Sequence, residues 1–190
     1  CPAFKNYIEK HFPTLKDAIS ETVSPMCAVS RYIKEKFPGA VTVFIGPCIA
    51  KKAESMSGEK DTADYALTYG EIRAMLRAKG VKLEPEEDTD DQGSIYGKKF
   101  ANAGGVTAAV LESMKELGCT GDVSVCKCSG ITECKKALTL MKVGRLPEDF
   151  VEGMVCEGGC VGGPSRHRDP NLAMRDRNAA LAKSSDILIQ

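Results

Sequence analysis

Hydrophobic residues recur at two spacings along the chain, and the two spacings separate predicted helices from predicted strands. Phe4, Ile8 and Phe12 lie on one face of a helix that Pro13 ends. Apolar spacing together with the residues that begin and end helices predicts four more helices. They cover the ranges 25–37, 68–80, 104–118 and 131–144.

Short apolar runs predict strands over the ranges 40–46, 122–128 and 150–156. The first run is continuously apolar or β-branched, which is typical of a parallel strand covered on both faces. Because strands alternate with helices, we expect an α/β fold with parallel or mixed sheets flanked by helices and right-handed crossovers.

The length of 190 residues suits one domain, or alternatively two small α/β lobes. The range 82–99 holds a dense acidic run and few large apolar residues. We expect it to be a solvated excursion between elements, partly ordered around Tyr96.

Charge and hydropathy exclude some classes of partner. The 26 Lys and Arg residues balance the 26 Asp and Glu residues, so no basic field predicts binding to nucleic acid or to an anionic membrane. No apolar stretch approaches the length of a membrane span, and residues 1–30 hold no secretory signal. We therefore expect a cytoplasmic protein, in which nine cysteines are ligands or redox groups rather than a disulfide framework.

Several cysteines follow predicted strands. Cys48 comes two residues after the strand predicted at 40–46, and Cys156 ends the strand predicted at 150–156. Cys126 and Cys128 come at the end of the strand predicted at 122–128. Because ligands gather at the carboxyl ends of parallel strands, a metal site is expected there. Cys160 follows Cys156 by one glycine-rich turn, which allows close backbone approach and leaves amide donors free for inorganic sulfide.

The alternative is that the cysteines are small buried hydrophobes, and Cys27 and Cys119 fit this better because they lie on or near apolar helix faces. Zinc sites usually pair Cys-x2-4-Cys with a second pair or with histidines, whereas His11 and His167 stand in no such pattern. Thiolates drawn from distant positions, with glycine amides around them, favour an iron-sulfur cluster.

Two stretches resemble signature motifs of the iron-only (FeFe) hydrogenases. "GPCIAKKAE" at 46–54 resembles the second motif and "EGMVCEGGCVGGP" at 152–164 the third. "CPAF" at 1–4 is similar to the end of the first motif, Thr-Ser-Cys-Cys-Pro, with Cys1 at its second cysteine. Their order and separation also fit, so the resemblance covers the range 1–164.

The resemblance implies the H-cluster, a 4Fe-4S cluster joined to a diiron subsite that carries carbon monoxide and cyanide. It implies that four cysteines ligate the four-iron cluster and that the last also bridges to the diiron subsite. These are Cys1, Cys48, Cys156 and Cys160.

The same resemblance implies roles for five other side chains. Lys51 would donate to a cyanide ligand, Met154 would pack near a bridging carbonyl, and Phe100 would line the pocket of the diiron subsite. Ser20 and Glu54 would belong to the proton path. Spacing alone would favour a solvated loop for Lys51, Glu54 and Ser20, and the motifs reverse that preference.

Two departures separate this chain from the common family pattern. Gly46 replaces the methionine of Met-Pro-Cys, and Met26 replaces the glutamine of Ser-Pro-Gln. Both resemble divergent or sensory branches. The proton-relay cysteine of the family would stand immediately before Cys1, so the 190-residue chain alone is expected to fold without evolving hydrogen.

The motifs do not account for four cysteines, which are Cys119, Cys126, Cys128 and Cys134. Cys-x-Cys-x5-Cys matches no assignable metal pattern. A second metal or redox site and reduced structural thiols are both left open.

We expect the chain to be the C-terminal part of a catalytic domain that interconverts dihydrogen with protons and electrons. Its expected partners are the upstream part of the same domain and an electron carrier such as ferredoxin or another redox subunit. Two alternatives are a non-enzymatic relative of iron-sulfur assembly proteins and a hydrogen or redox sensor. Lys51 and Met154 argue against the first, since a four-iron cluster needs neither.

Overall fold

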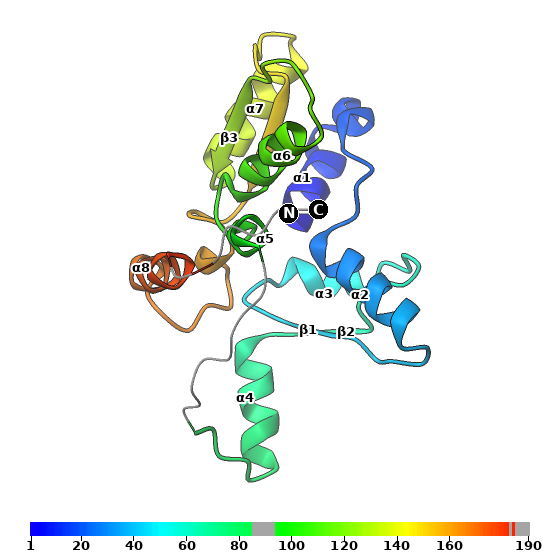
Figure 1. The fold of residues 1–190 in the computed structure, drawn as a ribbon, viewed down its shortest axis with the longest axis vertical. Helices are drawn as coiled ribbons and strands as arrows, with labels where there is room; N and C mark the ends of the chain where they lie inside the picture. Colours follow the sequence, from blue (N-terminus) through cyan, green and yellow to red (C-terminus); the bar gives the residue numbers. More distant parts are fainter. Residues whose placement is uncertain (85–93, 183, 185–190) are drawn as a thin grey trace. The chain divides into compact units, whose positions relative to one another are not determined.

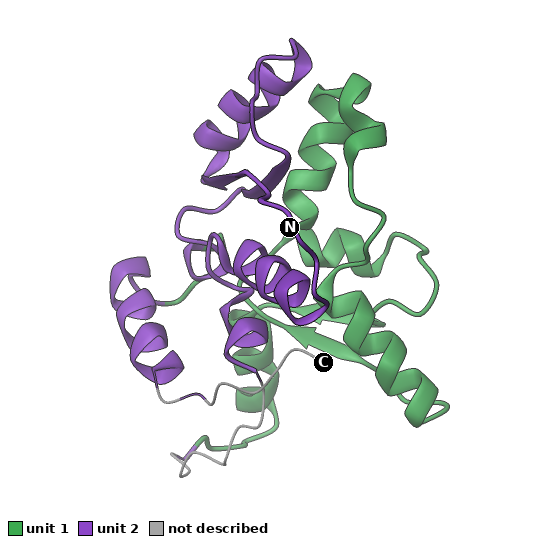
Figure 2. Ribbon diagram, turned by 45° about the horizontal axis from the view of Figure 1, so that its top comes forward, with its two compact units in different colours: residues 1–83, 163–167 green, residues 84–162, 168–190 purple. Residues whose placement is uncertain are grey.

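The computed structural model describes residues 1–84, 94–182 and 184. The chain divides into two compact units (Figure 2). Unit 1 comprises Cys1–Leu83 and Gly163–His167, and unit 2 comprises Glu84–Gly162 and Arg168–Gln190. Each unit holds a two-stranded parallel sheet with helices beside it, which confirms the predicted α/β class.

Unit 1 is built around strands β1 (Val43–Ile45) and β2 (Tyr65–Leu67). They pair in parallel, with Val43 opposite Tyr65 and Ile45 opposite Leu67. The helix between them is α3 (Ala50–Ser55), and it packs against β2. The other helices of unit 1 are α1 (Pro2–His11), the 3-10 helix η1 (Pro13–Ala18), α2 (Pro25–Lys36) and α4 (Tyr69–Ala78).

The prediction for the first strand was wrong in length and in burial. The strand covers three residues rather than the range 40–46, and Val43 and Ile45 are 46% and 44% exposed. Alternate side chains of a strand point to opposite faces, so one face of β1 is open in this structure and the other carries Phe44. An apolar run alone does not reveal whether another element covers it.

In unit 2, strands β3 (Val125–Ser129) and β4 (Phe150–Met154) pair in parallel over five residue pairs (Figure 1). Helix α7 (Ile131–Lys142) connects them and packs on both, burying Cys134 and Leu138. The remaining elements are α5 (Ile95–Lys99), α6 (Gly105–Glu116), the 3-10 helix η2 (Cys160–Gly162) and α8 (Pro170–Leu181).

The predicted capping residues mark the start of helix α4. Thr68 and Glu71 form the predicted capping box of α4, in which each side chain accepts the backbone N–H of the other residue. The predicted excursion at 82–99 lies partly outside the described residues, and its described end, Ile95–Lys99, is helical. Among the described residues no helix has the length and apolar character that a membrane crossing requires.

Asp64 joins α2 to the start of the unit 1 sheet. Its carboxylate accepts from Lys34 Nζ at 2.8 Å and from the Thr42 backbone N–H at 2.7 Å. The hydrogen bond from Lys34 and then that from Thr42 lower the pKa of Asp64 to about 2. The contacts stabilise the ionised form of Asp64 in the folded chain.

Asp64→Asn should make the chain less sensitive to acid. A lowered pKa in the folded state contributes stability above the unfolded value of about 3.9, and this stability is lost as pH falls toward about 2. Because Asp64 is partly solvated, we expect an effect of about 1 kcal/mol or less. Urea unfolding at pH 7 and pH 3 measures it; an unchanged difference between the two pH values in the variant would contradict the assignment.

Candidate functional site

The nine predicted site residues are divided between the two units. Unit 1 holds Cys1, Ser20, Cys48, Lys51 and Glu54; unit 2 holds Phe100, Met154, Cys156 and Cys160. Within residues 1–84, 94–182 and 184 no cluster of three or more His, Cys, Asp or Glu side chains has metal-binding geometry. The convergence of the four cysteines is therefore still a prediction, and the site is described unit by unit.

Cys48 lies in the loop between β1 and α3, just past the carboxyl end of the strand, and is half-buried. The Gly46 backbone N–H donates to the Leu67 carbonyl at 3.0 Å, and the Ser165 N–H donates to the Pro47 carbonyl at 3.0 Å. These bonds hold the loop on both sides of Cys48. Cys1 is exposed at the start of α1, where its carbonyl accepts the first N–H groups of the helix.

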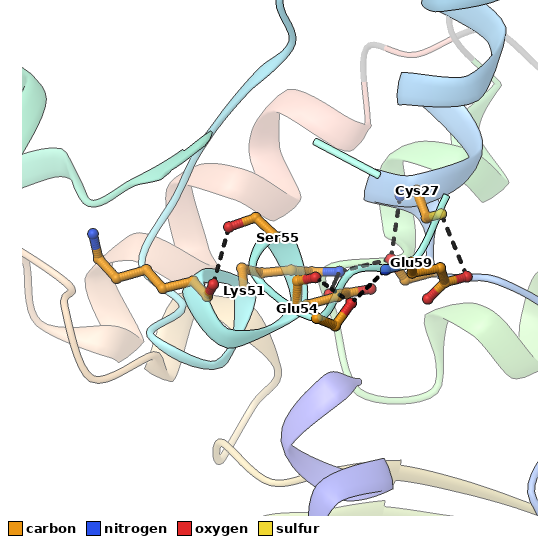
Figure 3. Close-up of polar contacts among 8 residues, drawn as sticks. Cys27, Lys51, Glu54, Ser55 and Glu59 are labelled. Atoms are coloured by element: carbon orange, nitrogen blue, oxygen red, sulfur yellow. Dashed lines mark hydrogen bonds and ion pairs between the residues drawn. The ribbon is translucent and has the colours of Figure 1, made fainter. Parts of the chain in front are cut away.

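Lys51 is a buried cation in the first turns of α3, only 8% exposed. Its Nζ donates to Glu54 Oε2 at 2.7 Å and to Ser24 Oγ at 2.9 Å (Figure 3). It also lies 5.9 Å from the centre of the Phe44 ring. A buried ammonium is costly unless it is paired, and these contacts provide the compensation.

Ser24 is a site residue that the sequence analysis did not assign. It is the N-cap of α2, where its Oγ accepts the Cys27 N–H at 3.3 Å, and it also accepts from Lys51. The signal was present in the sequence, because a serine directly before a proline is typical of a helix start. Ser24 thus joins α2 to α3 through Lys51.

Ser20 does not join this cluster. Its side chain is exposed, and its Oγ accepts the Thr22 backbone N–H at 3.2 Å. In the part of the chain that is described, no hydrogen bond links Ser20 to Glu54. The structure therefore brings together Lys51 and Glu54 of the predicted polar residues, and leaves Ser20 apart.

Cys27 is fully buried on α2, as expected for a cysteine on an apolar helix face. Its Sγ donates to Glu59 Oε1 at 3.7 Å, and Arg31 pairs with the same oxygen at 3.1 Å. Burial and then the Glu59 charge raise the pKa of the Cys27 thiol. Cys27 is therefore a protonated structural thiol at neutral pH.

The turn from Cys156 to Cys160 is held against the segment that follows Phe100. Cys160 N–H donates to the Ala101 carbonyl at 2.7 Å, and Ala103 N–H donates to the Gly158 carbonyl at 3.3 Å. Gly159 has φ +99°, and a Cβ added there would lie 2.2 Å from the Ala101 carbonyl oxygen. Only glycine allows this approach, so the turn that carries the two thiols packs closely against the segment that follows Phe100.

Buried Met154 ends β4 two residues before Cys156, and its carbonyl accepts the Gly130 N–H at 2.7 Å. Phe100 is half-buried after α5. The hydrogen bonds between the Cys156–Cys160 turn and residues 101–103 therefore connect the segment after Phe100 to the end of β4, where Met154 lies.

Glu152 is a second functional residue that sequence reasoning missed. It is 6% exposed in the middle of β4 and accepts from the backbone N–H groups of Gly104 and Thr107 at 2.9 and 2.8 Å. The Thr107 hydroxyl donates to the same carboxylate at 2.5 Å. Glu152 therefore caps α6 from a neighbouring strand and attaches the end of the loop that follows Phe100 to β4.

Residues 1–164 match the family described as the iron only hydrogenase large subunit, C-terminal domain. The chain belongs to this family. The match includes all four cysteines predicted as cluster ligands, and it confirms the resemblance drawn from the three motifs.

Relatives of two kinds are similar to this member of the family. The periplasmic [Fe] hydrogenase large subunit of Nitratidesulfovibrio vulgaris is 29% identical over 86% of the chain and 49% of its own length. Iron hydrogenase 1 of Clostridium pasteurianum is 27% identical over 90% of the chain and 38% of its own length. A probable cytosolic Fe-S cluster assembly factor of Brugia malayi is 24% identical over 92% and 49%. The chain thus spans about half or less of these relatives.

A solved FeFe hydrogenase, from work on its oxygen inactivation at the 2Fe subcluster of the H cluster, has the same fold. It aligns with a TM-score of 0.70 and 24% identity over 100% of the chain and 66% of its own. At 24% identity this similarity shows a shared fold and nothing further. It agrees with the short parallel sheets and flanking helices of both units.

Proposed function

We propose that this FeFe hydrogenase domain belongs to an enzyme that interconverts dihydrogen with protons and electrons. The observation that carries the proposal is Lys51, a buried cation three residues after Cys48. Glu54 and Ser24 accept two of the three N–H donors of this ammonium, and a four-iron cluster held by thiolates does not need the third. An anionic cyanide ligand of a diiron subsite does.

The residues present fit an H-cluster in their chemistry. Cys156 and Cys160 provide two thiols on one tight turn, and Cys48 provides a half-buried thiol three residues before Lys51. The expectation of free glycine amides in this turn is wrong for three of them, because the N–H groups of Gly158, Gly159 and Gly162 donate to Ser129 Oγ and to the Cys156 and Gly159 carbonyls. With Cys1, these three cysteines would hold the four-iron cluster, and Cys160 would also bridge to the diiron subsite. When bound, the cofactor supplies the redox chemistry of dihydrogen, and the protein supplies ligation, shielding and proton routing.

Lys51 has three N–H donors, of which Ser24 and Glu54 accept two in the described structure. The third is available for an anionic ligand. Met154 and Phe100 would shield the subsite from water. Glu54 would hold the ammonium in place, and its carboxylate and the Ser20 hydroxyl are the proposed acceptors of the proton path.

The whole protein is proposed to work with the upstream part of the same domain and with an electron carrier such as ferredoxin. A cytoplasmic location is also a proposal. Nine cysteines in a chain of 190 residues agree with a reducing compartment, although one hydrogenase relative is named as periplasmic.

Two other functions have specific support. The Brugia relative favours an iron-sulfur assembly role, in which no diiron subsite is present. Gly46 and Met26 replace residues of the common family pattern and favour a sensor that uses the same cluster. Buried Lys51 argues against the assembly role, and the sensor differs from the enzyme in rate rather than in cofactor.

Infrared spectroscopy of the matured full-length protein tests the proposal. Carbon monoxide and cyanide bound to iron give stretches that few other proteins show, so their presence distinguishes the hydrogenase and the sensor from the assembly protein. Hydrogen evolution from reduced methyl viologen then separates enzyme from sensor. A matured protein with four-iron signals and none of these stretches would overturn the proposed function.

Lys51→Ala in the full-length protein should lower hydrogen turnover by about 10–100-fold, as loss of an outer-shell partner of a metal site typically does. The carbon monoxide and cyanide stretches should weaken, while the visible absorption of the four-iron cluster is retained. Lys52→Ala is the matched control, because Lys52 is an adjacent cation that pairs with Glu71 and is 32% exposed. Equal activity of the two variants would remove the main argument against the assembly role.

A further inference from the structure

Three cysteines of unit 2 have no part in the proposed hydrogenase site. Cys126 and Cys128 lie on β3, and Cys134 lies in the first turn of α7, which packs on that strand. Residues two apart on a strand point to the same face, so the first two thiols are neighbours. Their Sγ atoms are 3.7 Å apart, within hydrogen-bond contact for sulfur.

The three thiols differ in burial. Cys126 is half-buried, whereas Cys128 is 3% exposed and Cys134 is fully buried. Burial, and then the hydrogen bond with Cys126, raise the pKa of Cys128 to about 12. Burial, and then the Glu133 charge, raise that of Cys134 to about 11. Both are protonated at neutral pH, whereas metals bind thiolates.

A metal site is thus the weaker explanation, since the described residues also contain no group of three ligands with metal geometry. The 3.7 Å contact between the Cys126 and Cys128 Sγ atoms points instead to a disulfide, which requires the pleat of β3 to contract because a disulfide holds its Cβ atoms about 3.5–4.5 Å apart. Alternate residues of a strand have Cα atoms about 6.6 Å apart, near the upper end of the range that disulfides span. On β4, Cys128 faces Gly153, which has no side chain to obstruct a small change in the pleat of β3.

We propose that Cys126 and Cys128 are a site of reversible oxidation by low-molecular-weight disulfides. The proposal goes beyond hydrogenase function and does not rest on it. The Cys126 thiolate attacks one sulfur of the small disulfide, forming a mixed disulfide and releasing one thiolate. Cys128 then attacks Cys126 Sγ, and its proton passes to the second small thiolate, which leaves as a thiol. Two protein thiols and one small disulfide become one protein disulfide and two small thiols.

Accessibility sets the order of these steps. Cys126 reaches solvent and is the first to react, while Cys128 is covered and reaches only its neighbour. A disulfide drawn between alternate residues of one strand is near the limit of its geometry, so it should be readily reduced.

Peptide mapping of the 190-residue chain after exposure to oxidised glutathione tests the site. The Cys119→Ser variant is used, because exposed Cys119 otherwise shares a peptide with Cys126. Cleavage after Lys127 separates the two strand thiols, and cleavage after Glu133 separates Cys128 from Cys134. After alkylation at low pH, we expect the Cys126 and Cys128 peptides to be joined, and dithiothreitol to release them.

Two variants separate the steps. Cys128→Ala should keep glutathione on Cys126, because no thiol resolves the mixed disulfide. Cys126→Ser should leave Cys128 without an adduct, because that thiol is covered. A Cys126 peptide that keeps glutathione while Cys128 is intact, or a Cys128 joined to Cys134 instead, would overturn the proposal. These readouts do not depend on the H-cluster, so they stand apart from any failure of the hydrogenase assignment.

Discussion

Cys160→Ser in the full-length protein should abolish hydrogen turnover. The proposed role of Cys160 is double, since its thiolate would ligate the four-iron cluster and also bridge to the diiron subsite. A serine hydroxyl is a poor ligand for iron-sulfur clusters, and it cannot replace a thiolate that two metal groups share. The loss should therefore exceed the 10–100-fold effect expected for Lys51, which would contact only a ligand of the subsite.

The measurement is hydrogen evolution from reduced methyl viologen by the matured protein, with infrared spectra of the same samples. Cys119→Ser is the matched control, because Cys119 is an exposed thiol beyond α6 and outside the proposed ligand set. It should keep full activity. A Cys160→Ser protein that retained most of its turnover would show that the cluster uses another ligand.

Local signals predicted five of the six helices of ten or more residues in the described structure, and missed α8. The Thr68 and Glu71 capping box placed the start of α4, and Gly118 lies two residues beyond the end of α6. These helices are determined by residues close together in sequence, so their boundaries could be predicted within a few positions. The missed elements α3 and β2 have six and three residues, too few for a periodicity to show.

The candidate site could be predicted only in part. The motifs selected Cys48, Lys51 and the turn that holds Cys160, and they pointed to the family to which the chain belongs; the roles of these residues stay predictions. The Lys51 pair with Glu54 depends on α3, which was not predicted, so the two side chains were assigned separate roles. Ser24 entered the cluster because α2 begins beside α3, a tertiary contact that neither segment reveals alone.

Glu152 is a clearer example of a residue whose role depends on a segment far away in the sequence. A glutamate inside a buried apolar strand contradicts the pattern of β4, and its explanation lies in α6, more than forty residues earlier. The N-cap of helix α6 is Gly104, which has φ +83° and no side chain to cap the first N–H groups. The carboxylate that satisfies them comes from the neighbouring strand instead.

Replacing Glu152 by alanine should destabilise the 190-residue chain by about 3 kcal/mol or more. The substitution leaves the Gly104 and Thr107 N–H groups and the Thr107 hydroxyl without their acceptor, and Thr107 is fully buried. Each buried donor left unsatisfied costs about 1–3 kcal/mol, and a negative charge at the start of α6 is lost as well. Glu152→Gln keeps one acceptor oxygen and should cost less.

Urea unfolding followed by far-ultraviolet circular dichroism gives the free energies. Glu112→Ala is the control on the same helix, because Glu112 pairs only with exposed Lys115 in the described structure. That pair lies at the surface and should contribute little to the free energy of unfolding. If Glu152→Ala and Glu112→Ala unfolded at the same urea concentration, the cap on α6 would contribute nothing measurable. The segment that follows Phe100 would then be held against the Cys156–Cys160 turn only by the backbone hydrogen bonds of Ala101 and Ala103.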